Sequence, residues 1–420
     1  METQQEKLFN AGFVGITLIN FFVYMVYYLL VTIIAFVASE ELHASTSAAG
    51  LATGIYIIGT LLARLYFGKT IEMMGRKAVL RWGAIFYLVT TLMYFWIPGM
   101  AVLFIIRFLN GFFYGMVSTA TNTIVTAYIP KARQGEGINY YGLSTALAAA
   151  LGPFIGSIIL HATNFTVTLI VCVVLVAIST AGALFFPAKN IEITEAMRKA
   201  SKDWSIKSLL EPRVYVISVV GFFMGLSYAA VVGFLNSYAA SGELVDGIIV
   251  WSSFFFLVYA LVVAVTRPVL GRVFDRFGES SVLYPSYLFL AIGCWILMGI
   301  SHIGNVAFAG VTMLIAGALI GLGYGNFMSN GQAVCLKLVT APSRVGVALS
   351  TYFIGLDLGL GVGPFFHGML HSALGSWSNV YIVAGVISIV AMAIYKFFYK
   401  GLTEEEIAAR NAAATTTVQS

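Results

Sequence analysis

Long apolar stretches, separated by short polar breaks, fill almost the whole chain. About twelve of them are close to the roughly 20 residues that a helix needs to cross about 30 Å of hydrocarbon. The pattern predicts an all-α membrane protein with transmembrane helices near residues 11–38, 48–68, 77–97, 100–127, 138–161, 165–187, 213–238, 247–267, 281–301, 304–337, 346–371 and 377–399.

The composition points the same way. Of the 420 residues, 60% are hydrophobic and 10% are charged, and the mean hydropathy is +0.91. Polar residues are too few to cover a water-soluble surface of this size, so we expect the chain to lie in a lipid bilayer. The first apolar stretch is too long for a signal-peptide core and follows no basic cluster, so we interpret it as a retained first helix.

The charged residues are sorted by side of the predicted membrane. With the N-terminus inside, the hairpins after helices 2, 4, 8 and 10 are cytoplasmic and hold Lys69, Arg76, Lys77, Lys131, Arg133, Arg272, Arg276 and Arg344. The outer loops instead hold Glu40, Glu41, Glu243 and Asp246. This asymmetry predicts a cytoplasmic location for both termini. It also explains a pI near 8.9 without a nucleic-acid partner.

One short motif occurs twice. Its first copy is Arg64, Gly68, Glu72 and Gly75, and the same spacings recur in Arg267, Gly271, Asp275 and Gly278. Each copy lies between two apolar stretches, where its glycines allow a tight turn. The duplication predicts two pseudo-symmetric six-helix bundles, residues 1–187 and 213–400, with a cytoplasmic linker at 188–212 and a cytoplasmic tail at 401–420.

We interpret the acids of the two motifs as gating latches between the bundles. Glu72 ends the second helix near the start of the eleventh, around Gly346, where unpaired N–H groups carry a partial positive charge. By the repeat, Asp275 would bind the start of the fifth helix near Ile138. Four arginines could orient the two acids: Arg64, Arg76, Arg267 and Arg272. The alternative is that these charges only satisfy the topology.

Helices 5 and 11 carry matching glycine and proline residues. These are Gly152, Pro153 and Gly156 in helix 5, and Gly363 and Pro364 in helix 11. Each proline removes one backbone hydrogen bond, and the glycines let a neighbouring helix approach closely. We therefore predict that both helices are kinked and tightly packed.

These motifs resemble those of a known family. The stretches RLYFGKTIEMMGRK and RPVLGRVFDRFG resemble the signature loops of the major facilitator superfamily, with Glu72 where that family usually has Asp. The Gly-Pro-x-x-Gly pattern at 152–156 resembles the antiporter motif of its drug:proton antiporters, although Asn139, Ala148 and Ser157 depart from that motif. The stretch GEGINYYGLSTALAAALGP is similar to arabinose-efflux-type permeases. The resemblance implies the major facilitator fold and favours export.

Two charged residues are expected to lie deep within the membrane, Arg107 in helix 4 and Asp357 in helix 11. Each costs on the order of 3 kcal/mol at mid-membrane, so neither is expected to face lipid. The family resemblance associates Arg107 with proton coupling. Asp357 has no counterpart acid in helix 5, where Ala146 stands. We interpret Asp357 either as a proton carrier or as a hydrogen-bonded packing residue.

The resemblance also implies a substrate cavity between the bundles, lined by helices 1, 4, 7 and 10. Their polar and aromatic residues include Asn20, Tyr24, Tyr27, Tyr28, Asn110, Tyr114, Ser118, Asn122, Tyr228, Asn236, Tyr324, Asn326, Asn330 and Gln332. Such residues suit a small amphipathic or hydroxylated solute, and packing is the alternative role for many of them. Helix 1 carries no buried acid, which favours neutral, zwitterionic or anionic cargo over organic cations.

The sequence thus predicts a proton-coupled exporter that works as a monomer by alternating access. A proton-coupled importer is the alternative, and a non-transporting membrane sensor or scaffold is the alternative from another class. The sequence contains no P-loop, catalytic triad or metal cluster, so we expect neither an enzyme nor a cofactor or metal.

Overall fold

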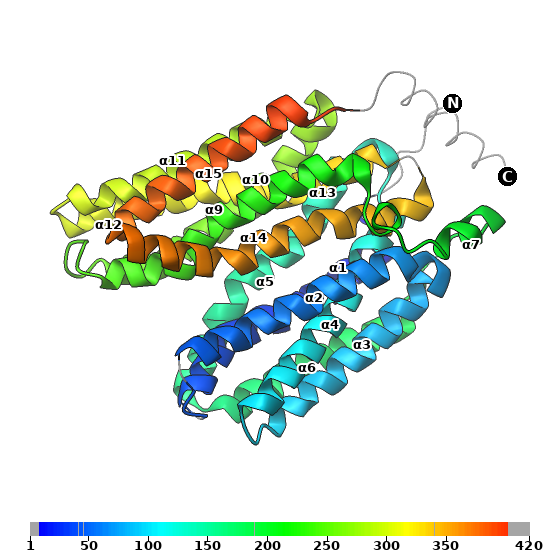
Figure 1. Ribbon diagram of the computed structural model, residues 1–420, viewed down its shortest axis with the longest axis horizontal. Coiled ribbons are helices and arrows are strands. Elements are labelled where there is room, and N and C mark those ends of the chain that lie inside the picture. Colours follow the sequence, from blue (N-terminus) through cyan, green and yellow to red (C-terminus); the bar gives the residue numbers. More distant parts are fainter. Residues whose placement is uncertain (1–7, 41, 45, 189, 340, 402–420) are drawn as a thin grey trace.

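Figure 1 shows the computed structural model, which describes residues 8–40, 42–44, 46–188, 190–339 and 341–401. The described chain is nearly all helical. The first bundle comprises α1 (Ala11–Glu40), α2 (Thr46–Met74), α3 (Arg76–Leu92), α4 (Met100–Val125), α5 (Gln134–Ala162) and α6 (Phe165–Phe185). The linker holds two short helices, α7 (Glu195–Ser201) and α8 (Ile206–Leu209).

The second bundle repeats this layout. It comprises α9 (Tyr215–Ala240), α10 (Ile249–Phe277), α11 (Ser280–Gly299), α12 (Val306–Ile320) with α13 (Asn326–Leu338), α14 (Val345–Leu374) and α15 (Trp377–Phe398). Within the described residues, ten helical stretches are long and apolar enough to cross a membrane. The 29-residue helices α2 and α5 bring the long helical segments to the predicted twelve, so the predicted fold class is confirmed.

Helices α2 and α10 are longer than the sequence pattern predicts. They end at Met74 and Phe277. The prediction ended them near residues 68 and 267, where the apolar runs give way to charged residues. The charges of the repeated motif therefore lie on helix, and the turn shrinks to Gly75 and Gly278. Both glycines have positive φ, at 86° and 84°.

Helix 10 of the prediction is not one regular helix. A π-helical segment, Gly321–Gly325, separates α12 from α13. A side chain at Gly323 would meet Leu290 of α11, whose backbone nitrogen lies only 2.5 Å from the Cβ position. Glycine is therefore needed for the close approach of α11, and the wider turn places Tyr324 in the interior of the bundle.

Glycines allow close contact between helices within each bundle. In the first bundle, Gly111 of α4 packs directly on the Tyr56 backbone of α2. In the second, Gly355 and Gly359 of α14 pack on the backbones of Ser218 and Phe222 in α9. Such contacts bring helix axes close together, which favours van der Waals packing where no hydrophobic effect drives association.

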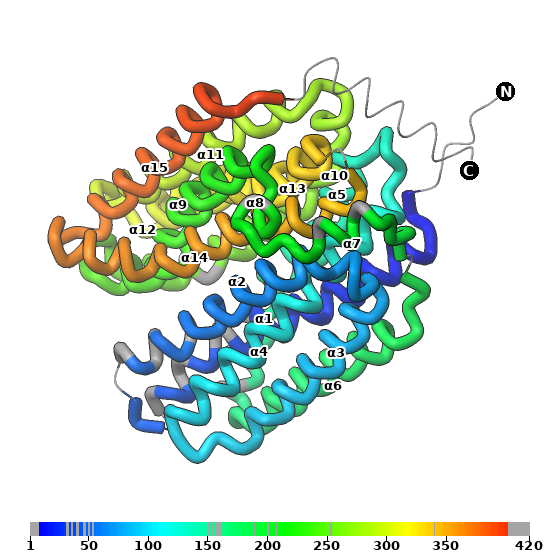
Figure 2. The backbone as a smooth tube through the Cα atoms, turned by 45° about the vertical axis from the view of Figure 1, so that its right-hand side comes forward, coloured from blue at the N-terminus to red at the C-terminus, as the bar shows by residue number. Residues whose placement is uncertain are grey.

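The two bundles lie side by side and touch along two seams, α2 with α14 and α5 with α10. We call the end of the molecule that carries α7 and α8 the linker end. Figures 1 and 2 both show the bundles close together at the linker end and diverging toward the opposite end. The contacts between the bundles therefore concentrate at the linker end and in the middle of the seams.

The tight turn between α10 and α11, at Gly278, can be tested by substitution. Its backbone, at φ 84° and ψ 170°, lies in a region that only glycine adopts easily, and nothing lies within 4 Å of its Cβ position. We expect Gly278→Ala to lower stability by about 1–3 kcal/mol through backbone strain alone. The thermal midpoint of the protein in detergent checks this. Gly299→Ala is the matched control, because Gly299 has equal space and a φ of −67°.

Candidate functional site

A salt bridge joins the two bundles in the middle of the α2–α14 seam. Nε of Arg64 on α2 lies 2.7 Å from Oδ2 of Asp357 on α14. The arginine is 2% exposed and the aspartate side chain is 23% exposed. The guanidinium also lies 4.8 Å from the ring centroid of Phe353, one turn before Asp357. The pair therefore neutralises two charges that neither bundle neutralises by itself.

Sequence reasoning missed this pair, although a signal for it existed. The sequence predicts that Arg64 helps to orient the acids of the repeated motif, and it predicts no partner for Asp357. Arg64 lies about ten residues, or about 15 Å, from the linker end of α2, and Asp357 about twelve residues, or about 18 Å, from that end of α14. Two opposite charges at similar depth on helices already expected to meet are candidates for a pair.

Glu72 is not where the latch prediction placed it. Its carboxylate accepts hydrogen bonds from Nε and Nη2 of Arg76, at 2.9 and 2.7 Å, and both side chains are buried. The start of α14 lies across a cavity of about 240 Å³ that Glu72 and Arg344 both line. The direct contact with α14 is made one turn earlier, where Gly68 packs against Gly346 and Ser350.

Asp275 makes the contact that the repeat predicts. Its carboxylate oxygens accept hydrogen bonds from the backbone N–H groups of Gly135 and Glu136, at 2.7 and 2.9 Å. These groups belong to the first turn of α5, so the acid of the second bundle caps a helix of the first bundle. The two copies differ because Arg76, which holds Glu72, is replaced by Glu279 at the equivalent position of the second copy.

Arg267, the counterpart of Arg64, binds only carbonyl oxygens. Nη2 donates to the Gly325 carbonyl at 2.7 Å, and Nη1 donates to the Gly142 carbonyl of α5 across the seam. The arginine is 2% exposed. Ala146 occupies the α5 position equivalent to Asp357, so the repeat supplies no acid there. The α5–α10 seam is therefore joined without an ion pair at this level.

Amide side chains join the bundles closer to the linker end. Nδ2 of Asn139 donates to Oδ1 of Asn330 at 2.9 Å, and Nε2 of Gln332 donates to Oδ1 of Asn122 at 3.0 Å. All four side chains are buried. Asn122 and Asn330, which the sequence assigned to the substrate cavity, thus belong to the closed end of the interface.

Three other amides of the predicted cavity bind inside their own bundle. Asn20 is fully buried among Thr121, Tyr141, Ser144 and Thr145 of α4 and α5. Asn326 donates to Thr266 at 3.0 Å, and Asn236 accepts from Ser252 at 2.9 Å. Helical periodicity alone does not fix which side of a helix faces the other bundle, and these side chains point into the bundles. Their contacts favour packing.

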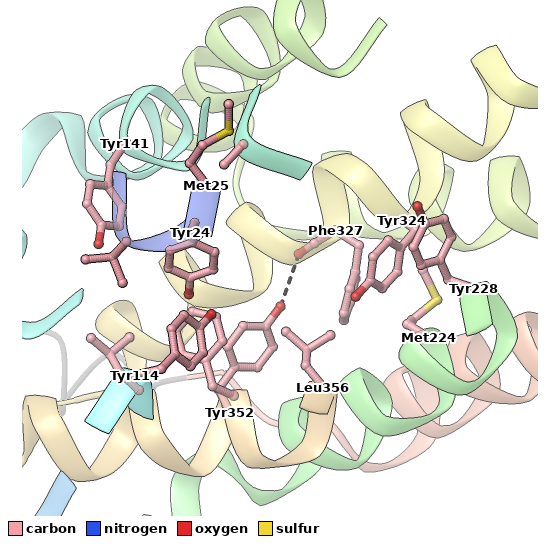
Figure 3. Packing of buried hydrophobic residues seen from close by; sticks show 14 of the residues in the cluster. Tyr24, Met25, Tyr114, Tyr141, Met224, Tyr228, Tyr324, Phe327, Tyr352 and Leu356 are labelled. Atoms are coloured by element: carbon pink, nitrogen blue, oxygen red, sulfur yellow. Dashed lines mark hydrogen bonds between the residues drawn. The ribbon is translucent and has the colours of Figure 1, made fainter. Parts of the chain in front are cut away.

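The predicted tyrosines form two aromatic groups that face each other. In the first bundle, the rings of Tyr27 and Tyr114 stack with centroids 4.9 Å apart, and Tyr24 packs edge-on to Tyr114 at 5.4 Å. In the second bundle, Tyr228 and Tyr324 stack at 4.1 Å. Figure 3 shows Tyr24 and Tyr114 on one side and Tyr228 and Tyr324 on the other, with α14 residues Tyr352 and Leu356 between them.

Asp357 interacts with both groups. It interacts electrostatically with Tyr27 of the first bundle and with Tyr324 of the second. Arg64 interacts in the same way with Tyr24 and Tyr114. Tyrosines of both bundles thus interact with the charged pair.

Arg107 lies inside the first bundle, away from this pair. Its Nε donates to the Ala52 carbonyl at 2.9 Å, Nη1 lies 3.4 Å from the Tyr94 hydroxyl, and the guanidinium stacks on the Tyr56 ring at 4.3 Å. It is fully buried, and no acidic side chain among the described residues pairs with it. Asp357 pairs with Arg64 and not with Arg107.

Comparison with known proteins identifies the family. The model of the Major Facilitator Superfamily matches residues 16–329 and 306–418. The chain belongs to this superfamily. Its members are carriers and not enzymes, and the protein is a multi-pass membrane transporter of this superfamily.

Relatives and solved structures span nearly the whole chain. An uncharacterised MFS-type transporter of Methanocaldococcus jannaschii is 22% identical over 84% of this chain and 89% of its own. The multidrug efflux protein YfmO of Bacillus subtilis is 25% identical over 85% of both chains. The structure of the human organic anion transporter MFSD10 matches with a TM-score of 0.71 and 13% identity, over 91% of this chain and 98% of that one. The fold is therefore the major facilitator fold.

The glycines beside Pro153 and Pro364 lie in close helix contacts in this superfamily member. Gly152 and Gly156 of α5 lie against Tyr28 and Leu29 of α1, and Gly363 of α14 lies against Ala229 of α9. Pro364 lies within α14, and α5 and α14 are both assigned as continuous helices. The side chain of Pro153 lies outside the described residues.

The linker of this transporter clamps the α2–α14 seam from outside. On the α2 side, Trp204 stacks on Tyr66 at 5.9 Å, and Nζ of Lys69 lies 4.2 Å from the Trp204 ring centroid. On the α14 side, Nε of Arg344 lies 2.6 Å from Oε2 of Glu211. Figure 2 shows both linker helices at the end where α2 and α14 meet. The linker therefore contacts both bundles at once.

Removing Trp204 tests this clamp. An exposed cation–π contact contributes about 0.5–1 kcal/mol, so Trp204→Ala should raise the population of detached linker roughly two- to fivefold. The rate of tryptic cleavage after the exposed Lys199 and Lys202 measures that population. Trp82→Ala removes a tryptophan of similar exposure, 56% against 53%, from α3, and it should leave the rate unchanged. Equal rates in all three proteins would rule out the clamp.

Proposed function

We propose that this transporter is a proton-coupled exporter that moves a small amphipathic or polar solute out of the cell by alternating access. The observation that carries the proposal is the bridge between Arg64 and Asp357. It joins the two bundles across the only seam where the described residues place opposite charges at mid-helix depth. A proton bound to Asp357 removes that attraction, so protonation and closure of the linker end exclude each other.

The energies are of a suitable size. Breaking a buried ion pair by neutralising one partner costs about 3–5 kcal/mol, and the partial exposure of Asp357 favours the lower end. Inverting a two-state population from 1:99 to 99:1 takes about 5.5 kcal/mol. One proton on Asp357 thus supplies more than half of the free energy that inverts the population from a closed to an open linker end.

The cycle follows from these two states. A proton from outside neutralises Asp357, the bridge breaks, and the bundles rock apart at the linker end. On the inside the proton leaves and cargo binds. The ionised Asp357 then pairs with Arg64 again, the linker end closes, and the cargo leaves on the other side. One proton enters for each solute exported, which is antiport.

The remaining contacts of the linker end act as parts of the same gate. These contacts all join groups from opposite bundles: Asp275 accepts from the first turn of α5, Arg267 donates to the Gly142 carbonyl, and two amide pairs bind each other. The Arg267 contact and the two amide pairs involve no acid. They therefore stabilise the closed state without making it respond to protons. The buried Glu72 and Arg76 pair braces α2 against α3 on one side of this gate.

Two further features support the proposal. Arg107 adds a second buried positive charge that, like Asp357, interacts electrostatically with Tyr27. Export outward from the cytoplasmic membrane agrees with YfmO, which is named as a multidrug efflux protein. Because basic residues gather at the linker end, the proposal has that end and both chain termini face the cytoplasm, in line with the positive-inside rule.

Energised inverted membrane vesicles test direction and coupling together. With a panel of drugs, dyes and polar metabolites, we expect at least one solute to accumulate in vesicles that hold the protein and an inward-acid pH gradient. Asp357→Asn should reduce this accumulation more than tenfold. Asp246→Asn, which changes an exposed acid between α9 and α10, should not.

Two results would contradict the proposal. Accumulation only in right-side-out vesicles would indicate the proton-coupled importer instead. Full accumulation by Asp357→Asn at equal expression would show that this acid does not carry the coupling proton. Transport of no solute in either type of vesicle would favour the sensor or scaffold.

A further inference from the structure

We propose that the cargo is a zwitterion, a solute with one cationic and one anionic group on an aromatic or apolar body. The proposal rests on the exporter function above. In the closed state, Arg64 and Asp357 are each other's counter-ion, and they belong to different bundles. When the bundles separate at the linker end, each bundle retains one unpaired charge. Cargo that binds there must satisfy both.

The arginine keeps a free donor even in the closed state. Nη1 of Arg64 is buried and has no hydrogen-bond partner among the described residues, while Nε holds Asp357. A guanidinium presents its N–H groups as a fork that matches a carboxylate. The partly exposed Asp357 offers an acceptor to an ammonium group in the same region. The site thus holds a carboxylate receptor on one bundle and an ammonium receptor on the other.

The aromatic rings fit the body of such a solute. Tyr24 and Tyr114 interact electrostatically with Arg64, and Tyr27 and Tyr324 do so with Asp357. Tyrosine faces supply apolar contact area, and their negative faces attract an ammonium group. Tyrosines of both bundles are therefore available to the body of a cargo whose two charges are held by Arg64 and Asp357.

Charge balance separates a zwitterion from singly charged solutes. A cation would pair with Asp357 but leave Arg64 buried without a partner, and an anion would do the reverse. Each unpaired charge in the membrane costs on the order of 3 kcal/mol. An anion avoids this cost only if Asp357 is protonated, and proton and solute would then travel together. The exchange of proton for solute requires cargo that neutralises both residues while Asp357 is ionised.

The same pair explains how the cargo is released. At 2.7 Å, Arg64 and Asp357 leave no space for a solute group between them. When the linker end closes, each residue replaces the cargo as the partner of the other. The cargo then loses its two charged contacts together, on the side where the bundles diverge (Figure 1). Asp357 therefore binds the proton and the cargo ammonium in turn.

Matched solutes test the proposal on the full-length protein in nanodiscs. Two series are used: tryptophan with tryptamine and indole-3-propionate, and 4-(aminomethyl)benzoate with 4-methylbenzylamine and 4-methylbenzoate. We expect the zwitterion of at least one series to bind at least tenfold more tightly than both singly charged analogues at pH 7. Asp357→Asn should reduce its affinity to that of the anion, and Arg64→Gln to that of the cation.

Folding controls keep the test decisive. The thermal midpoint identifies any variant that fails to fold, and the charge-swapped double variant Arg64→Asp with Asp357→Arg keeps the pair. That double variant should still prefer the zwitterion. Equal or tighter binding of a singly charged analogue, or no binding in either series, would overturn the proposal. Proton-driven transport of a singly charged solute would overturn it too and leave the exporter function intact, whereas loss of proton dependence would overturn that function.

Discussion

A charge that leaves water for the interior of a membrane protein has to be paired there, and the two bundles meet this requirement jointly. Arg64 belongs to one bundle and Asp357 to the other, and they are neutral together only while α2 and α14 are in contact. The two buried charges are thus paired only when the linker end is closed. Neutralising the acid with a proton removes that condition, which converts a local chemical event into a movement of whole bundles.

The internal duplication provides the scaffold, and its departures from symmetry provide the chemistry. Arg64 and Arg267 stand at equivalent places, yet only the first has an acid opposite, because α5 carries Ala146 where α14 carries Asp357. At the level of the two arginines, only the α2–α14 seam therefore carries an acid. The acids of the motif differ in the same way, since Arg76 retains Glu72 within its bundle while Asp275 reaches across to α5.

Much of this architecture was predictable from the sequence, because it depends on periodic properties. Apolar length gave the number of helices, the repeated motif gave two related halves, and the repeat placed Asp275 at the start of α5. The ends of α2 and α10 were placed too early because a charge was taken to end a helix. A charged residue that faces another part of the protein does not end a helix, and α2 and α10 continue past such residues along the seams between the bundles.

The errors at the candidate site have one physical origin. Sequence gives the position of a residue along a helix, but not the direction in which its side chain points around the helix axis. Asn20 and Asn326 therefore looked like cavity residues, although both bind within their bundles. The pairing of Arg64 with Asp357 required the relative depth of two helices far apart in sequence, which only the assembled bundles fix.

The central claim is that the protonation state of Asp357 decides whether the linker end is closed. Spin labels on Phe185→Cys and Phe397→Cys, exposed positions near the linker ends of α6 and α15, report the separation of the bundles there, and the native cysteines are buried. Double electron–electron resonance should show a longer distance gaining population as the pH falls. In Asp357→Asn the longer distance should dominate at every pH. A pH-dependent shift that persists unchanged in Asp357→Asn would contradict the account.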